Sequence, residues 1–269
     1  MTTVRDIVHH LEFIMPWSNG ECETVDQLVF GDMDDLVHGV AVTFIASYEV
    51  LQDAVQQEAN LIISHEGLFY QHMGGSGELS QDPVYAEKLE YIVKNNLAVY
   101  RLHDRPHRTR PDWIVQGMAK RLGWRDMMGD GYRTSFDAPI VQLSPISLGQ
   151  LINQIKKAFC LSQVRVVGHP TLICRRAGLL PGYRGGGAAA IPYLRQADLD
   201  VIIVGEGPEW ETAEYVRDAV AMGHAKAMVI IGHQQSEEAG MEMIADSLRD
   251  LVAPIPVRFF PLHPVFRVL

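Results

Sequence analysis

The hydrophobic positions of this chain alternate between two spacings, one typical of helices and one typical of buried strands. In residues 3–14, apolar side chains recur every three or four positions, which predicts an amphipathic helix. Residues 38–44 and 60–64 are short apolar runs rich in β-branched side chains, which predict strands. Residues 48–59, between these runs, return to the helical spacing. The beginning of the chain therefore predicts helices and strands in alternation.

The same alternation continues to the end of the chain. Further helices are predicted at residues 83–96, 113–122, 148–159 and 208–222, and from residue 236 onward. Further strands are predicted at residues 97–102, 139–143, 163–167, 199–204, 227–231 and 257–260. This order predicts an α/β fold with mostly parallel sheets covered by helices. The pattern restarts near residue 130, so we expect two similar three-layer α/β units, 1–128 with 228–269, and 129–227.

Candidate metal ligands follow three of the predicted strands. His65 and Glu66 come directly after the second strand, and the segment HDRPH, from His103 to His107, comes directly after the third. Each cluster alone has an ordinary interpretation, a strand end that faces solvent or a polar surface loop. Ligands in sheets of this kind, however, bind outside the carboxyl ends of the strands. The positions of these side chains therefore predict that they lie together.

A third cluster, GHQQSE at residues 232–237, places His233 four residues before Glu237. We expect His233 to precede the helix and Glu237 to turn back from its first turn. The ordinary interpretation is that Glu237 only complements the positive end of the helix dipole. The coincidence of three such clusters at strand ends favours a metal centre, which we expect between the two units. Imidazole with carboxylate suits zinc, iron, manganese or nickel better than calcium.

The composition narrows the class of protein. A net charge of −10 argues against a nucleic-acid binder, because phosphate contacts need a basic face. The three cysteines have no CxxC spacing, which excludes a zinc ribbon and suits a reducing cytoplasm. No segment has the roughly 18 consecutive apolar residues of a membrane span. We therefore expect a cytoplasmic protein that acts on a small molecule.

The motifs together resemble the Nif-three-like dinuclear metal centre family, whose members are often named GTP cyclohydrolase I type 2 homologues. The family's I-I-x-H-H-P, His-x-x-x-Asp, T-G-E and G-H-x-x-S-E segments are matched by residues 62–67, 103–107, 204–206 and 232–237. The match spans nearly the whole chain in order. The family's W-D-N-x-G-L segment is missing, since residues 17–29 read WSNGECETVDQLV. One wall of the pocket is therefore expected to differ.

The resemblance implies two divalent transition-metal ions and a set of five ligands. The ligands that it implies are His65, Glu66, His107, His233 and Glu237. Glu66 stands where the family has a histidine and His107 where it has an aspartate, so three histidines and two carboxylates are retained. Asp104 is a competing ligand if the register of its loop differs. His103, just outside this set, is expected to be the catalytic proton shuttle, because imidazole titrates near neutral pH.

Three functional hypotheses remain open. The first is a metal-dependent hydrolase, with GTP ring opening or hydrolysis of phosphate esters or amides as the reaction. The second is a non-catalytic metal-binding or scaffold protein with the same ligands. The third is an α/β protein without metal. The resemblance also implies a homohexamer.

Overall fold

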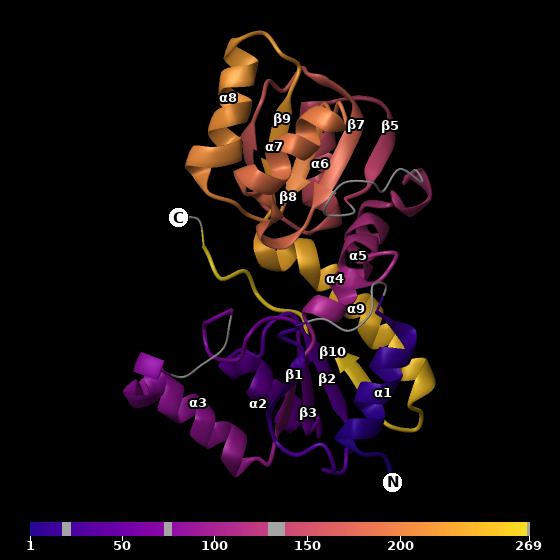
Figure 1. The fold of residues 1–269 in the computed structure, drawn as a ribbon, viewed down its shortest axis with the longest axis vertical. Coiled ribbons are helices and arrows are strands. Elements are labelled where there is room, and N and C mark those ends of the chain that lie inside the picture. The colour runs from indigo at the N-terminus through magenta and orange to yellow at the C-terminus, as the bar shows by residue number, and fades with distance from the viewer. Residues whose placement is uncertain (18–22, 73–76, 129–137, 268–269) are drawn as a thin grey trace. The chain divides into compact units, whose positions relative to one another are not determined.

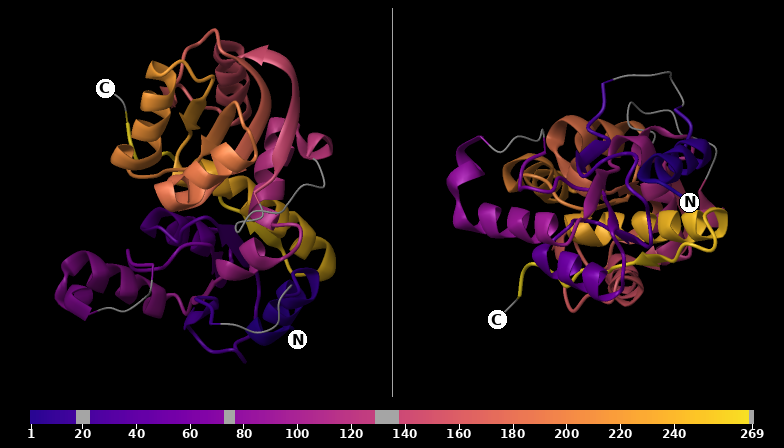
Figure 2. Two further views of the ribbon diagram at one scale, coloured as in Figure 1. Left: turned by 45° about the horizontal axis from the view of Figure 1, so that its top comes forward. Right: turned by 90° about the horizontal axis from the view of Figure 1, so that it is seen from below.

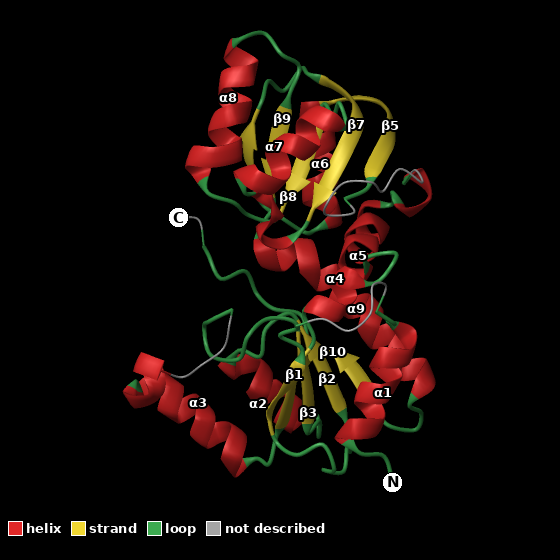
Figure 3. Cartoon of the chain, viewed as in Figure 1, coloured by secondary structure: helices red, strands yellow, loops and turns green. Residues whose placement is uncertain are grey.

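The computed structural model describes residues 1–17, 23–72, 77–128 and 138–267, which form two compact units. Unit 1 consists of Met1–Trp113 and Met241–Leu269, and unit 2 of Ile114–Gly240. Each unit contains one five-stranded sheet. Helices lie around each sheet, as Figures 1 and 3 show. The predicted α/β class with two sheets is confirmed. The predicted domain boundaries, one of which falls among the undescribed residues 129–137, stay a prediction.

The sheet of unit 1 has the order β1-β4-β3-β2-β10, in which only β1 runs antiparallel to its neighbour. Its three middle strands are buried at every position, so both faces of the sheet are covered. The strands are β1 (Gln27–Phe30), β2 (Val40–Thr43), β3 (Leu61–Ser64), β4 (Ala98–Arg101) and β10 (Val257–Phe259). The helices that begin in unit 1 are α1 (Val4–Ile14), α2 (Tyr48–Gln56), the 3-10 helix η1 (Gly77–Gln81), α3 (Pro83–Lys94), α4 (Asp104–Arg108) and α5 (Trp113–Leu122).

The parallel register of unit 1 places its strand ends together. Ser64 is paired with Arg101 and with Thr43, so β2, β3 and β4 end at one edge of the sheet. The next residues, His65 after β3 and His103 after β4, are therefore delivered to the same edge. This is the arrangement that the apolar runs predicted.

The sheet of unit 2 has the order β5-β7-β8-β9-β6, with parallel pairs in the centre and an antiparallel strand at each edge. The long β5–β7 pair is visible at the upper right of the left view in Figure 2. The strands are β5 (Ile140–Ser147), β6 (Arg165–Val167), β7 (Ile173–Leu180), β8 (Val201–Val204) and β9 (Ala227–Ile230). The remaining helices are η2 (Arg125–Met127), α6 (Leu148–Ala158), η3 (Gly182–Gly185), α7 (Gly187–Gln196), the π-helix η4 (Glu209–Ala213), α8 (Glu214–Ala221) and α9 (His233–Leu251).

Alternate side chains of β8 show that unit 2 has three layers. Val201 and Ile203 pack in one apolar cluster with side chains of α5 and α6. Ile202 and Val204 pack in a second cluster with side chains of α7 and α8. Since neighbouring residues of a strand point to opposite faces, the sheet lies between two helical layers.

Membrane insertion has no candidate segment in the described part of the chain. None of its helices combines the length and the apolar character that a crossing needs.

Candidate metal centre

His65 is fully buried at the carboxyl end of β3. Its Nδ1 lies 3.0 Å from the carbonyl oxygen of Leu102, the residue that follows β4. A carbonyl oxygen only accepts, so Nδ1 carries the proton and the lone pair of the ring is on Nε2. The neighbouring strand therefore fixes both the orientation and the tautomer of His65.

His103 and His107 are positioned by the short helix α4, which we had expected to be a loop. Asp26 accepts hydrogen bonds from the backbone N–H groups of His103, Asp104 and Arg105, at 2.6, 2.7 and 2.8 Å. A carboxylate that satisfies the first N–H groups of a helix acts as its cap. Burial raises the pKa of Asp26, and the three N–H donors oppose that rise. The cap comes from a residue 77 positions earlier in the chain, so the local sequence of α4 could not reveal it.

His65, His103 and His107 form a compact cluster, which we call the histidine triad. The rings of His65 and His103 are stacked, with centroids 4.6 Å apart and planes inclined by 24°. The ring of His107 lies edge-on to both, at 5.1 Å from His65 and 5.3 Å from His103. One ring nitrogen of each histidine lies within 4.8 Å of those of the other two. The chemistry and spacing of this donor set fit a transition-metal ion.

Carboxylates hold the other two rings of the triad. His103 Nδ1 donates to Asp104 Oδ1 at 3.0 Å, and His107 Nδ1 donates to Asp112 Oδ2 at 3.2 Å. Asp112 is 1% exposed, so its partner ring is fixed from the protein interior. Histidines that bind metals commonly have a carboxylate or carbonyl on the other nitrogen. All three triad histidines have this partner.

Glu66 lies beside the triad and is paired with a buried arginine. Its Oε1 is 3.7 Å from His103 Nε2, and its Oε2 is 3.4 Å from Arg101 Nη2. The Arg101 side chain is 3% exposed. It also donates to two atoms of His72, the carbonyl oxygen and, at 3.1 Å, the ring Nδ1. Glu66, His72 and His103 form a second group with ligand-like spacing. Both His72 and Arg101 are residues that the motifs did not identify.

The protonation of the cluster follows from its surroundings. Burial lowers the pKa of His103 to about 4, aided by His65 and His107 and opposed by Asp104 and Glu66. The pKa of Asp104 is lowered although burial raises it, because His103, the Val25 N–H and Arg108 stabilise the carboxylate. Near neutral pH, His103 is therefore an uncharged imidazole, the form that binds metals.

The other two predicted ligands, His233 and Glu237, lie in unit 2. Our expectation that His233 precedes the helix is wrong, because α9 begins at His233. The two residues are therefore one helical turn apart, with His233 Nε2 3.1 Å from Glu237 Oε2. His233 Nδ1 donates to Glu206 Oε1 at 2.9 Å. Glu206, which the VGE segment had placed at a strand end, orients this ring.

A glycine turn packs against this first turn of α9. Gly182 has a φ of +63°, and a Cβ there would lie 2.1 Å from Glu237 Oε1 and 3.2 Å from His233 Nε2. Its N–H donates to Ser236 Oγ at 2.9 Å, and that hydroxyl donates to the His233 carbonyl at 2.6 Å. The absence of a side chain at Gly182 therefore leaves room for the His233–Glu237 pair.

The structure thus groups the predicted residues by unit. His65, Glu66, His103 and His107 lie together in unit 1, and His233 lies with Glu237 in unit 2. The assignment of these residues as ligands stays a prediction.

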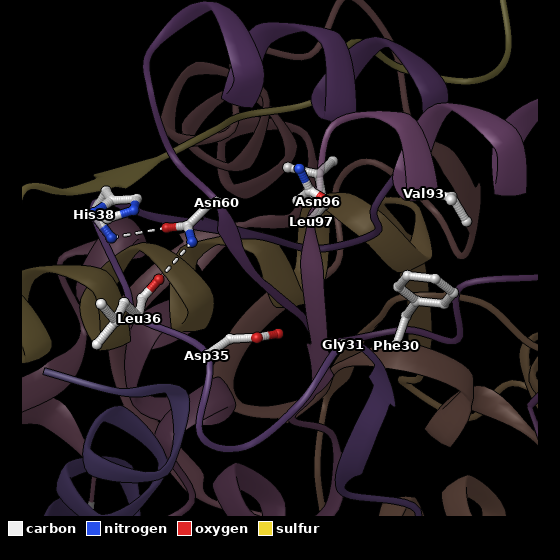
Figure 4. Close-up of a pocket in the computed structure, with 9 residues that line it drawn as sticks. All are labelled: Phe30, Gly31, Asp35, Leu36, His38, Asn60, Val93, Asn96 and Leu97. Atoms are coloured by element: carbon white, nitrogen blue, oxygen red, sulfur yellow. Dashed lines mark hydrogen bonds between the residues drawn. The ribbon is translucent and has the colours of Figure 1, made fainter.

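A pocket of about 400 Å³ opens elsewhere in unit 1, around residues that precede β3 and β4 (Figure 4). Asn60 lies in its wall, but its side chain already accepts from the His38 N–H at 2.8 Å and donates to the Leu36 carbonyl at 2.7 Å. Its remaining lining residues are Phe30, Gly31, Asp35, Val93, Asn96 and Leu97. The pocket is at the amino ends of the strands, whereas the triad is at their carboxyl ends.

Comparison with known proteins gives one consistent family. The profile of Duf34/NIF3 (NGG1p interacting factor 3) matches residues 2–264. A protein named GTP cyclohydrolase 1 type 2 homolog from Chlamydia pneumoniae is 23% identical over 252 residues, which are 91% of this chain and 93% of that protein. A protein of the same name from Deinococcus radiodurans is 26% identical over 222 residues, 80% and 77% of the two chains.

Solved structures share the fold. The Bacillus cereus protein related to NIF3 superposes with a TM-score of 0.78 at 16% identity, covering 100% of this chain and 99% of its own. Reduced HcgD from Methanocaldococcus jannaschii has a TM-score of 0.72 at 14% identity, covering 96% and 97% of the two chains.

Proposed function

Since the chain belongs to the Duf34/NIF3 family, we propose that it is a dinuclear metal-binding protein that acts as a metal-dependent hydrolase. The proposed ligands are His65, Glu66, His107, His233 and Glu237. The family resemblance inferred from the motifs is confirmed. The number of ions, their identity and the hydrolytic activity belong to the proposal.

One observation carries the proposal. Within unit 1, three imidazoles and a carboxylate converge, and each triad ring has its Nδ1 held by an oxygen atom. A surface loop rich in histidine would not need a buried aspartate behind His107 or a carbonyl behind His65. The arrangement is typical of imidazoles that bind a metal ion.

The side chains around the cluster have distinct tasks. Arg101 holds one oxygen of Glu66, which leaves the other directed towards His103. Glu206 orients His233, and Asp112 orients His107. Divalent ions bound to this set would supply Lewis acidity and make water a stronger nucleophile at neutral pH. Zinc, iron, manganese and nickel all accept such mixed imidazole and carboxylate ligands.

The names of the relatives suggest GTP as one substrate to test. Three cations of the segments that form the cluster are engaged by carboxylates, Arg101 by Glu66, Arg105 by Glu12 and Arg108 by Asp104. This arrangement does not favour a triphosphate over a smaller ester or amide. We therefore keep the substrate class broad, as a small molecule with a hydrolysable bond.

The experiment measures turnover by the full chain after removal of metal and reloading with each of the four ions. Substrates are GTP, a phosphomonoester, a phosphodiester and an amide. We expect turnover that depends on metal and falls by at least about 100-fold in Glu237→Ala. Glu238→Ala, the neighbouring buried carboxylate, is the matched control and should keep the activity.

Two results would redirect the proposal. Two bound ions without turnover on any substrate would favour the non-catalytic metal-binding or scaffold hypothesis. Fewer than about 0.2 equivalents of any ion after reloading would contradict metal binding itself. The proton-shuttle role of His103 and the homohexamer stay predictions, which a pH profile of turnover and the mass in solution test.

A further inference from the structure

We propose that His103 is itself a metal ligand, so that the histidine triad forms a three-imidazole metal site built entirely within unit 1. This inference deepens the proposed function and rests on its metal-binding part. It replaces the shuttle role of His103 and adds a ligand to the five implied by the family motifs. The juxtaposition of His65, His103 and His107 carries it.

The tautomers of the triad are the first argument. His65 donates from Nδ1 to a carbonyl, and His103 and His107 donate from Nδ1 to carboxylates. All three rings therefore have their lone pair on Nε2, the nitrogen remote from the backbone. For His103, Nε2 faces the Glu66 carboxylate at 3.7 Å, on the side of the ring opposite Asp104. The lone pair of His103 therefore points away from its carboxylate partner, as the lone pairs of metal-binding imidazoles do.

Asp104 is the competing ligand in this segment, and its oxygens are already engaged. Oδ1 accepts from His103, and Oδ2 accepts from the Val25 N–H at 3.1 Å and from Arg108 at 3.1 Å. A carboxylate with three donors would have to give them up to reach a metal ion. Asp104 therefore orients His103 and leaves metal binding to the imidazole.

His72 provides the contrast. It lies near Glu66 and His103, with its ring centroid 4.8 Å from that of His103. Its Nδ1, however, lies 3.1 Å from Arg101 Nη2. A guanidinium only donates, so Nδ1 is the acceptor and the proton of a neutral His72 is on Nε2. In this arrangement the lone pair of His72 is directed at Arg101, so the proposed site does not include His72.

The donor set has a consequence for the choice of metal. Three neutral imidazoles bring no negative charge, and the nearby Glu66 carboxylate is offset by Arg101. Magnesium and calcium require mainly oxygen ligands, whereas zinc, cobalt, nickel and copper accept imidazole. The triad should therefore discriminate strongly against magnesium and calcium.

The test uses the full chain, freed of metal and loaded with Co²⁺. Bound metal is measured by equilibrium dialysis with elemental analysis, and the imidazole N–H protons by paramagnetically shifted NMR resonances. The variants are His103→Gln, the matched control His72→Gln, and the double variant His233→Ala/Glu237→Ala. Circular dichroism verifies that each variant folds.

We expect His103→Gln to weaken binding of one ion by at least about 100-fold, beyond the roughly 10–100-fold effect of losing an outer partner. It should also remove one shifted N–H resonance. His72→Gln should change neither quantity. The double variant should still bind one ion, and that ion should be lost when His103→Gln is added.

Unchanged stoichiometry and an unchanged set of shifted resonances in His103→Gln would overturn the inference. If His103→Gln fails to fold, the wild-type spectrum decides, because a triad site requires a shifted N–H resonance from His103. If metal binding depends on His103 but no substrate is turned over, the hydrolase proposal is contradicted and this inference remains intact. Loss of all metal in the double variant would contradict the inference, since the triad would then not suffice.

Discussion

The two units bury charge very differently. Among the described residues, unit 1 buries Lys88, Arg101, Asp104, Arg105 and Asp112, together with His65. In unit 2 the buried charged side chains are Glu237 and Glu238, both in the first turns of α9. Burying a charge is unfavourable unless it is paired. Unit 1 therefore depends more on paired buried charges, most of which lie around the histidine triad.

The two units also hold their histidines by different means. In unit 2, His233 and Glu237 meet through the spacing of one helix. In unit 1, the triad depends on Asp26, Asp112 and the Leu102 carbonyl, which come from separate segments. The comparison teaches that a site assembled by several tertiary contacts depends more on distant residues than a pair brought together by one helix, which Glu206 orients from outside.

Lys88 gives the largest expected effect and tests the electrostatic side of the comparison. Burial lowers its pKa to about 8, and its Nζ donates to the Leu68 carbonyl at 2.7 Å. The unfolded chain binds the proton up to about pH 10.4, so stability should rise between pH 8 and 10.4, by up to about 3 kcal/mol. Below pH 8 both states are charged and the penalty is constant.

Denaturant unfolding of the wild type and of Lys88→Met across this pH range measures the effect. The variant should lack the rise, and the difference between the two curves removes the contribution of other titrating groups. Parallel curves would show that folding does not lower the pKa of Lys88 and would weaken the contrast between the units.

Gly117→Ala tests unit 2, where we expect stability to depend on close backbone packing more than on buried charges. A Cβ at Gly117 would lie 2.3 Å from the Gly240 nitrogen and 2.4 Å from its Cα, so the backbones of α5 and α9 would have to separate. We expect a loss of about 2–3 kcal/mol in unfolding free energy. Gly149→Ala, whose Cβ would have its nearest neighbour at 3.5 Å, should change stability by less than about 0.5 kcal/mol. Equal effects of the two substitutions would argue against the close crossing.

Asp26→Ala tests the dependence of the triad on a distant residue. The substitution removes the acceptor of three N–H groups at the start of α4. We expect a loss of about 2 kcal/mol in unfolding free energy. Metal affinity should also fall, because His103 and His107 lose their fixed positions. Asp26→Asn retains one acceptor oxygen, so its stability and metal affinity should lie between those of the wild type and those of Asp26→Ala. An unaltered metal affinity in Asp26→Ala would contradict the dependence of the triad on Asp26.

Glu206→Gln gives the smallest expected effect. The carboxylate accepts from His233 Nδ1, and Gln keeps an acceptor oxygen but loses the charge. We expect metal affinity to fall by about tenfold with little change in stability. Metal competition with a chromogenic chelator measures it. If metal affinity falls as far as in Asp26→Ala, the two sites are equally sensitive to distant residues, which would contradict the difference between the units.

Much of the fold and part of the site follow from the sequence. The apolar runs identified β2, β3, β4, β8 and β9, because strands buried on both faces are nearly all apolar. Since parallel strands end at one edge, the positions of His65 and His103 followed. β7 was harder to predict, because its first half carries Arg175 and Arg176 and its buried part includes Gly178. Neither an apolar run nor an alternation is clear there.

The rest of the site depends on contacts that no local pattern contains. α4 has too few residues for a helical periodicity, and its cap is supplied by Asp26. His72 lies outside any strand, and its role is set by Arg101. The missing W-D-N-x-G-L segment falls in part on residues 18–22, outside the described residues.

The pairing of β10 with β2 has a consequence for synthesis of the chain on the ribosome. Val257 pairs with Val40, so the sheet of unit 1 joins segments from near the two ends of the chain, whereas Ile114–Gly240 is continuous. Until residue 259 emerges, β2 presents an open edge that can pair with another nascent chain. Unit 2 can complete its sheet earlier. The part of the molecule that carries the triad is therefore the last to be finished and the one that most needs protection while translation continues.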